Sequence, residues 1–302
     1  MPKSLRPETD PFSQMFDRRD LILVTGKGGT GKSTLVAALA ELAARRRGSA
    51  VAVEMSVHPH LPELLGPTTQ VQTVCVDLEQ AVPAAMGRLL RLPALVTRVF
   101  NNRFIRLFIR TSPAVREMIL LDELHHLVDV HSRRGTPVIV DLPASGHALS
   151  FLDTPRAVNR MLRVGPLAQV AARVEALILD SSRCELVIVA LPEELPINET
   201  IELVRRATEI GLASRTVIVN QVPSPSVDPE DRPLLDLLHR EGDAQIGHFA
   251  SIARSGLDGL DQARAQIDRL RSALDDAVVE LPFHLDTDPR RRVAALIRAL
   301  VP

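Results

Sequence analysis

The sequence of 302 residues contains no tryptophan and no tyrosine, and only two cysteines, Cys75 and Cys184. Without these aromatic residues the usual stacking platforms for bases are missing, so we expect no nucleic-acid partner. The two cysteines lie far apart and form no CxxC pair. Their spacing argues against a disulfide framework or a self-contained zinc site and is typical of a reducing cytoplasm. The formal net charge of −1 excludes a general attraction to polyanions.

Long apolar segments are also missing from the sequence. No window of about 18 consecutive apolar residues occurs, so no transmembrane helix is expected. The first ten residues lack the apolar stretch of a signal peptide. We therefore expect a cytoplasmic protein, with peripheral attachment to the inner face of the membrane as an open alternative.

The sequence does contain short apolar runs that alternate with longer helical patterns. Continuous runs of Val, Ile and Leu indicate strands that are buried on both faces, as in a parallel sheet. The expected fold class is α/β, a doubly wound and mostly parallel sheet with helices on both faces. The expected strands lie at residues 21–25, 50–53, 71–76, 137–142, 186–191, 216–220 and 278–283, with 71–76 at an edge.

Two segments between expected strands are longer than ordinary connections, which usually have about 2–6 residues in α/β units. Residues 78–135 and 224–276 show helical patterns, and we interpret them as helical insertions. Residues 1–19 are polar, contain three prolines and are expected to form a flexible arm. We therefore expect a single domain over residues 20–302.

The sequence GKGGTGKS at residues 26–33 matches the phosphate-binding pattern GxxxxGK[ST]. It follows an expected strand and opens an expected helix, which is the context that the motif requires. The backbone N–H groups of such a loop converge on phosphate oxygens at the positive end of the helix. Lys32 is expected to bridge the β- and γ-phosphates of ATP, and the Ser33 hydroxyl is expected to bind Mg²⁺. The predicted nucleotide contacts of the loop are Gly28, Gly29, Thr30, Gly31, Lys32, Ser33 and Thr34.

The additional lysine of this loop, Lys27, carries a resemblance to a known superfamily. The pattern KGGTGKS resembles the deviant phosphate loop of ParA, MinD, the nitrogenase iron protein and the arsenite-pump ATPase. In these P-loop proteins the first lysine crosses a dimer interface to the nucleotide of the partner. The resemblance therefore implies a dimer of two copies, or of this chain with a related ATPase subunit, in which Lys27 acts on the partner's ATP.

Two later segments resemble one branch of this superfamily. Residues 141–149, DLPASGHAL, are similar to the DxxPxGHxL switch of the arsenite-pump and tail-anchored-protein-targeting ATPases. This resemblance implies that Asp141 helps to hold Mg²⁺ and that the Gly146 N–H senses the γ-phosphate. The strand end VNQ implies that Asn220 and Gln221 contact the base. The implied cofactors are ATP and Mg²⁺, and the implied activity is ATP hydrolysis coupled to a client.

At one position the sequence departs from this family. The family carries an aspartate after the second strand that positions the attacking water, and Ser56 stands at this place. Phosphoryl transfer depends mainly on positioning and electrostatics, and losing a positioned acid–base group typically costs about 10²–10⁴-fold in rate. We therefore expect slow or conditional hydrolysis. Glu54, two residues earlier, either replaces the missing carboxylate or packs at the strand end, and we favour the second interpretation.

Residues 88–116 form an arginine-rich segment, because no acidic residue lies between Glu79 and Glu117 whereas seven arginines do. Apolar residues recur at helical spacing within it. The pattern indicates either a surface helix that meets a protein client or anionic lipid, or an ordinary helix with a solvated arginine face. Family members place their client-binding helices in this region.

Three functions remain open. The first is an ATP-driven switch that binds a client. The second is a weakly active regulatory or scaffold subunit of a heteromeric ATPase pair, and the third is a ParA/MinD-like positioning ATPase. The Gly-His pair within residues 141–149, the switch segment, favours the client-binding switch over the positioning ATPase. The absence of a CxxC zinc site, and cysteines that do not match the arsenite-binding set, argue against a tail-anchor carrier and a pump subunit.

Overall fold

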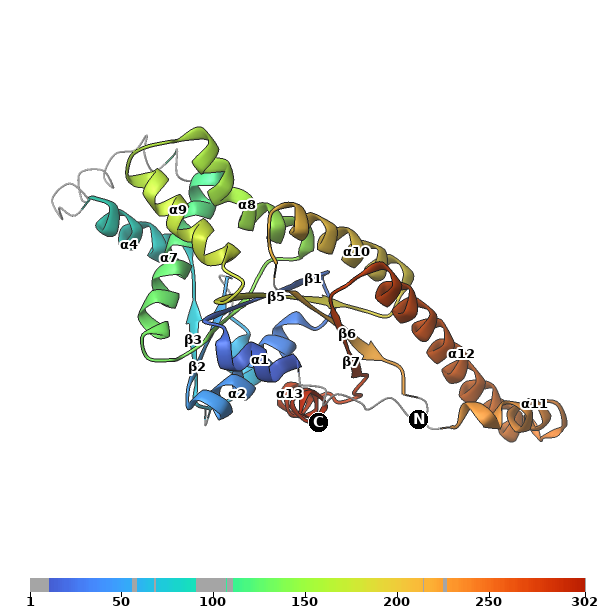
Figure 1. Ribbon diagram of the computed structural model, residues 1–302. Coiled ribbons are helices and arrows are strands. Elements are labelled where there is room, and N and C mark those ends of the chain that lie inside the picture. Colours follow the sequence, from blue (N-terminus) through green and yellow to red (C-terminus); the bar gives the residue numbers. More distant parts are fainter. Residues whose placement is uncertain are drawn as a thin grey trace, which may run out of the picture.

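The computed structural model describes residues 11–55, 59–67, 69–90, 107, 111–213, 215–224 and 227–301. Within these residues, seven parallel strands form one sheet in the order β3-β2-β4-β1-β5-β6-β7 (Figure 1). The predicted α/β class is confirmed, and β3 lies at an edge as expected. The strands are β1 Leu21–Gly26, β2 Ala50–Glu54, β3 Val71–Cys75, β4 Val138–Asp141, β5 Cys184–Ala190, β6 Arg215–Val222 and β7 Ala277–Pro282.

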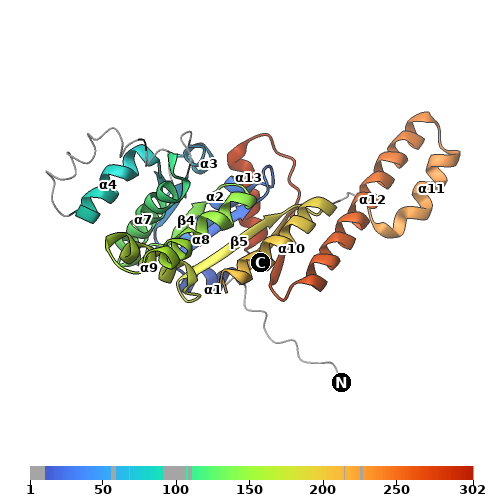
Figure 2. The same ribbon diagram turned by 90° about the horizontal axis from the view of Figure 1, so that it is seen from above.

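Helices cover both faces of this sheet, as the two perpendicular views show (Figures 1 and 2). The helices on one face are α1 Pro11–Arg18, α2 Lys32–Arg47, α3 Leu61–Leu65 and α13 Pro289–Leu300. The other face is covered by α7 Pro113–Ser132, α8 Ser145–Met161, α9 Pro166–Leu179, α10 Glu194–Glu209 and part of α12 Ala244–Ala273. The remaining helices are α4 Leu78–Leu90, α11 Arg232–Glu241 and a short 3-10 turn at Pro229–Asp231.

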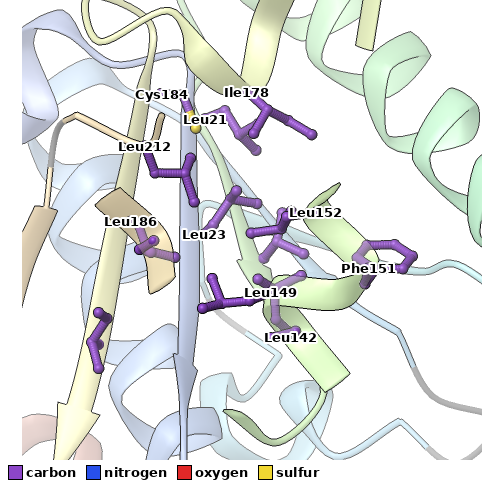
Figure 3. Packing of buried hydrophobic residues seen from close by; sticks show 14 of the residues in the cluster. Leu21, Leu23, Leu142, Leu149, Phe151, Leu152, Ile178, Cys184, Leu186 and Leu212 are labelled. Atoms are coloured by element: carbon purple, nitrogen blue, oxygen red, sulfur yellow. The ribbon is translucent and has the colours of Figure 1, made fainter. Parts of the chain in front are cut away.

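The central strand β1 shows why its sequence is apolar without alternation. Successive side chains of a strand point to opposite faces of the sheet. Leu21 and Leu23 therefore face the layer of α8 and α9, whereas Ile22 and Val24 face α2, and all four are fully buried. Figure 3 shows Leu21 and Leu23 beside Leu149, Leu152 and Ile178 from the covering helices. Burying each such side chain contributes about 1.5–3 kcal/mol.

The expected flexible arm over residues 1–19 differs from the structure, because residues 11–18 form the helix α1. Phe12, Met15 and Phe16 are buried, and they pack into the layer of the core that contains α2. The Arg46 side chain of α2 also lies over the Phe16 ring, 5.6 Å from its centroid. Three apolar residues at helical spacing decide this outcome, although the composition around them is polar.

The two predicted insertions contain helices. Residues 224–276 hold α11 and α12, a hairpin that projects from the body of the molecule (Figures 1 and 2). Residues 78–135 hold α4 and α7, but most of the arginine-rich segment lies outside the described residues. Its first arginine, Arg88, is paired with Asp122 and Glu123 of α7, at 2.8 and 2.7 Å. Among the described helices, none has both the length and the apolar character needed to cross a membrane.

Candidate active site

At two positions of the loop that connects β1 to α2, the backbone geometry requires glycine. Gly26 has a φ of 151°, and a Cβ there would collide with the Val189 carbonyl oxygen. Gly31 precedes α2 with a φ of 88°, and its Cβ would lie 2.6 Å from Asn220 Nδ2. These positive φ values are rarely adopted by other residues. The loop therefore reaches the N-terminus of α2 in the shape that exposes its backbone N–H groups to phosphate.

Polar side chains from β4 and α2 meet directly behind this loop. Because β4 pairs with β1, Asp141 at its carboxyl end lies beside the start of α2. The Ser33 hydroxyl donates a hydrogen bond to Asp141 Oδ2 at 2.5 Å. Lys32 Nζ donates to the Lys27 carbonyl oxygen at 3.1 Å, and Thr30 Oγ1 donates to the same oxygen at 2.9 Å. The structure thus brings together the predicted phosphate-binding lysine and the predicted magnesium ligands.

The charges at this point are incompletely balanced. Burial raises the pKa of Asp141, and the Glu54 carboxylate raises it further, whereas the Ser33 hydrogen bond and Lys32 lower it. Burial also lowers the pKa of Lys32, and Asp141 opposes this shift. A triphosphate would stabilise the charged lysine, and a divalent cation would stabilise the carboxylate. Hydroxyl and carboxylate oxygens are the hard ligands that Mg²⁺ prefers, so the residues present fit this ion.

A cavity of about 200 Å³ adjoins the loop at Gly31 and Thr34. Asn220 of β6 lines this cavity and also contacts the loop, because its Nδ2 donates a hydrogen bond to the Thr30 carbonyl oxygen at 2.8 Å. Gln221 has a φ of 61°, a conformation that is uncommon for a residue other than glycine and is often found at functional sites. The other lining residues come from β7, α13 and the connection between them: Pro282, Phe283, His284, Arg292 and Leu296. The cavity lining thus includes both residues that were predicted to contact the base, Asn220 and Gln221.

Comparison with known proteins agrees with this geometry. A family model described as an AAA domain matches residues 15–154, the part of the chain that holds the phosphate loop and Asp141. The ATPase BagA of Mycobacterium tuberculosis is 30% identical over 230 residues, which cover 70% of this chain and 67% of that protein. This chain belongs to the same family of P-loop ATPases.

More distant relatives of the ATPase match the branch that the motifs resemble. An arsenical pump-driving ATPase of Escherichia coli is 24% identical over 249 residues, which cover 80% of this chain but only 42% of that protein. The protein named ATPase ASNA1 homolog of Plasmodium vivax is 20% identical over 278 residues, covering 76% of this chain and 70% of that protein.

The additional lysine of the ATPase is held away from its own phosphate-binding lysine. Lys27 Nζ pairs with Glu199 Oε1 of α10 at 2.8 Å, and both side chains are close to half exposed. The backbone carbonyl of Lys27 is the part that contacts Lys32. Its ammonium group therefore lies at the surface of the loop, where another molecule can reach the pair.

The structure describes only one of the two residues that were predicted to act on water. Ser56 lies outside the described residues. Glu54 is buried, and its Oε2 accepts hydrogen bonds from the backbone N–H groups of His60 and Leu61, at 2.7 and 3.2 Å. This carboxylate holds the start of α3, so a second use on water remains a prediction. Gly146 lies exposed in the first turn of α8, and its contact with the γ-phosphate remains a prediction as well.

Sequence reasoning missed Glu199 and the contribution of β7 and α13 to the cavity. His284 is the most informative of these residues, because its Nε2 is buried and has no hydrogen-bond partner among the described residues. A buried polar atom without a partner is uncommon, and a water molecule or a ligand in the cavity would satisfy it. The position of His284 directly after an expected strand was the available signal, since ligands bind beyond the carboxyl ends of parallel strands.

Proposed function

We propose that the ATPase is a nucleotide-switched dimer that closes around ATP, hydrolyses it slowly and couples its nucleotide state to binding of a client. The partner is a second copy or a related ATPase subunit. The observation that carries this proposal is the position of Lys27. Its own loop already has Lys32 for the phosphates, and its ammonium group is exposed on an ion pair with Glu199.

In this proposal each residue of the site has one task. The N-terminus of α2 and Lys32 bind the phosphates, and the cavity beside Asn220 binds the base. Ser33 and Asp141 would hold Mg²⁺, which supplies positive charge next to the phosphates. Lys27 leaves Glu199 and reaches the partner's nucleotide, where its charge stabilises the charge that develops on the transferred phosphoryl group. Dimer formation and hydrolysis are thereby linked.

Complementation between two inactive variants tests whether Lys27 acts in the partner. Lys27→Ala keeps its own phosphate site, whereas Lys32→Ala loses that site but can still donate Lys27. Mixing them yields hybrid dimers with one complete site. Random mixing of equal amounts makes half of the dimers hybrid, so about a quarter of all sites are complete and we expect about a quarter of the wild-type single-turnover amplitude.

A matched mixture controls for residual activity. Lys32→Ala combined with the double variant Lys27→Ala/Lys32→Ala contains no complete site and should stay inactive. If the Lys27→Ala and Lys32→Ala mixture is as inactive as its two components, Lys27 does not act across the dimer.

The slow hydrolysis is tested by Ser56→Asp. Restoring the carboxylate should raise the single-turnover rate by about 10²-fold or more, because a positioned acid–base group typically contributes about 10²–10⁴-fold. Ser56→Asn, which has the same shape without the charge, is the control and should stay near the wild-type rate. Fast hydrolysis in the wild type, unchanged by Ser56→Asp, would contradict the proposal.

The client side of the proposal is supported by the far end of α8. This helix begins within residues 141–149, the switch segment. Its last residue, Met161, is 82% exposed, and Leu162 and Val164 of the connection to α9 are exposed by 42% and 87%. Arg160 and Arg163 lie among them. Exposed apolar residues beside arginines are typical of a surface that meets a protein or an anionic membrane. Flotation with vesicles of anionic lipid, with and without ATP, tests the membrane alternative. No flotation in either state leaves a protein client.

A further inference from the structure

The hairpin of α11 and α12 fills its interior with its own side chains. Figures 1 and 2 show that it projects from the body of the ATPase. Its interior residues are Leu235 and Leu238 of α11 with Ala250, Ala253 and Leu257 of α12. Large apolar residues elsewhere on its surface are therefore not explained by packing between the two helices.

Five such residues are exposed. One of them, Ile246, lies in the first turn of α12, and we call the other four the apolar strip. They are Leu234 and Leu237 of α11, exposed by 52% and 45%, and Phe249 and Ile252 of α12, exposed by 69% and 56%. Each of them directly precedes an interior residue in the sequence. Each residue advances by about 100° around the helix axis. On both helices, the strip residues are therefore rotated in the same direction away from the interior residues.

Ion pairs show how these sides are arranged in the hairpin. Arg232 of α11 pairs with Asp258 and Asp261 of α12, at 2.6 and 2.5 Å. Arg254 of α12 pairs with Asp236 of α11 at 2.9 Å. Within the hairpin these charged residues lie to the opposite rotational side of the interior from the strip. Because they join the two helices along one side, the apolar residues share the other side and form one continuous surface.

The hairpin leaves the sheet beside the nucleotide site. β6 carries Asn220 and Gln221 of the cavity, and the chain runs from the end of β6 into α11 (Figure 1). In parallel strands this carboxyl edge is also the edge at which the phosphate loop and Lys27 lie. The hairpin therefore starts at the same edge of the sheet as the face that the partner of the proposed dimer would cover.

We propose that the apolar strip packs against the apolar strip of a second copy of this chain. A two-fold contact requires a self-complementary surface, and a strip without charges does not repel its own copy. Removing four large apolar side chains per copy from water stabilises the contact, and two hairpins joined in this way form a four-helix bundle. The choice of a second copy as the occupant rests on the proposed nucleotide dimer. A standard interface buries about 800 Å² per partner, so the strip adds to the nucleotide face and does not replace it.

Sedimentation equilibrium of the full-length protein tests this contact, with Mg²⁺ and a non-hydrolysable ATP analogue and without nucleotide. We expect the wild type to dimerise in both conditions and more tightly with the analogue. The double substitution Phe249→Glu/Ile252→Glu should raise the dimer dissociation constant by at least about 30-fold, because it places charges in the centre of the contact. Binding of the analogue by the monomer should not change.

Two control variants separate this effect from general changes of charge. Val164→Glu changes an apolar residue that is 87% exposed at the turn between α8 and α9, and Asp258→Asn changes the ion-paired side of the hairpin. Both should dimerise like the wild type. If Phe249→Glu/Ile252→Glu dimerises as tightly as the wild type, the proposal is overturned. If this variant in addition loses binding to vesicles of anionic lipid, the strip meets lipid instead.

The same measurements distinguish the strip from the proposed function. If nucleotide does not affect dimerisation and the lysine variants do not complement each other, the nucleotide dimer is wrong. A weakened dimer of Phe249→Glu/Ile252→Glu would still support the strip in that case.

Discussion

Asp141 is a residue at which stability and function have opposite requirements. Its carboxylate is largely buried beside Glu54, and this environment raises its pKa above the ordinary value of 3.8. The folded protein without nucleotide therefore binds the proton of Asp141 more tightly than the unfolded chain does. Stability is lost as the pH rises from 3.8 through the raised pKa, and it stays lower above that pH.

Asp141→Asn is therefore expected to increase the free energy of unfolding of the nucleotide-free ATPase at pH 7. The neutral amide avoids the burial of a charge, and it can still accept the hydrogen bond from Ser33. Urea unfolding midpoints at several pH values measure the effect. The difference between variant and wild type should be present at pH 7 and should shrink as the pH falls through the raised pKa toward 3.8.

Addition of Mg²⁺ and ATP provides the internal control for this variant. A ligand that binds the folded state stabilises it more when it binds more tightly, so the wild type, which keeps the carboxylate, should gain more. A variant that is less stable than the wild type at pH 7 without nucleotide, or a difference that does not depend on pH, would contradict the burial argument.

At the scale of elements, α1 shows that a short helix can belong to the core of the sheet. Phe16 is 1% exposed, and Phe12 and Met15 of the same eight-residue helix are buried with it. An isolated helix of this length is unstable in water, so its contacts with α2 must hold it in place.

Phe16→Ala is expected to lower the free energy of unfolding by about 3–5 kcal/mol, the usual cost of removing a buried phenylalanine ring. Val164→Ala is the matched control, because Val164 is 87% exposed and surface substitutions usually change stability by less than about 0.5 kcal/mol. Chemical denaturation measures both variants. A loss below about 1 kcal/mol for Phe16→Ala would mean that residues 11–18 are the loose arm expected from composition.

The sheet and the phosphate loop were predictable at this scale, and the helices that surround them were only partly so. Strands such as 21–25 and 137–142 are continuous apolar runs, and only a sheet covered on both faces buries such runs completely. The start of α2 follows from the loop motif directly before it. The helix α1 was missed because three apolar residues within a polar, proline-containing segment are a weak local signal.

At the scale of the whole molecule, the ion pair between Lys27 and Glu199 opposes the proposed dimer. Lys27 reaches the partner's nucleotide only after it leaves Glu199 of its own chain. Exposed ion pairs contribute about 0.2–1 kcal/mol, so the pair shifts the equilibrium toward the monomer by a small factor.

Glu199→Gln is therefore expected to tighten the ATP-dependent dimer by up to about 30-fold, because the amide holds Lys27 less strongly and each dimer has to release two such pairs. Glu202→Gln is the control, since it breaks an exposed ion pair with Arg205 on the same helix without touching Lys27. Sedimentation with the ATP analogue measures both variants. An unchanged dimer in Glu199→Gln, or an equal change in both variants, would show that Glu199 does not restrain Lys27.

The sequence by itself determined the fold class and predicted which residues would meet phosphate and Mg²⁺. Both depend on information that is local in the chain: continuous apolar runs, a contiguous glycine-rich loop, and the carboxylate at the end of the strand at 137–142. These features act within a few residues, so they are visible without knowing which segments meet.

Only the tertiary structure decided which distant groups share the site. Glu199 lies 172 residues beyond Lys27, and His284 reaches the cavity from the connection that follows β7. The apolar strip also required the structure, because the ion pairs between α11 and α12 establish which sides of the two helices lie together. Contacts of this kind follow from the order of the strands and the packing of the helices. Neither is encoded in the spacing of residues along one segment.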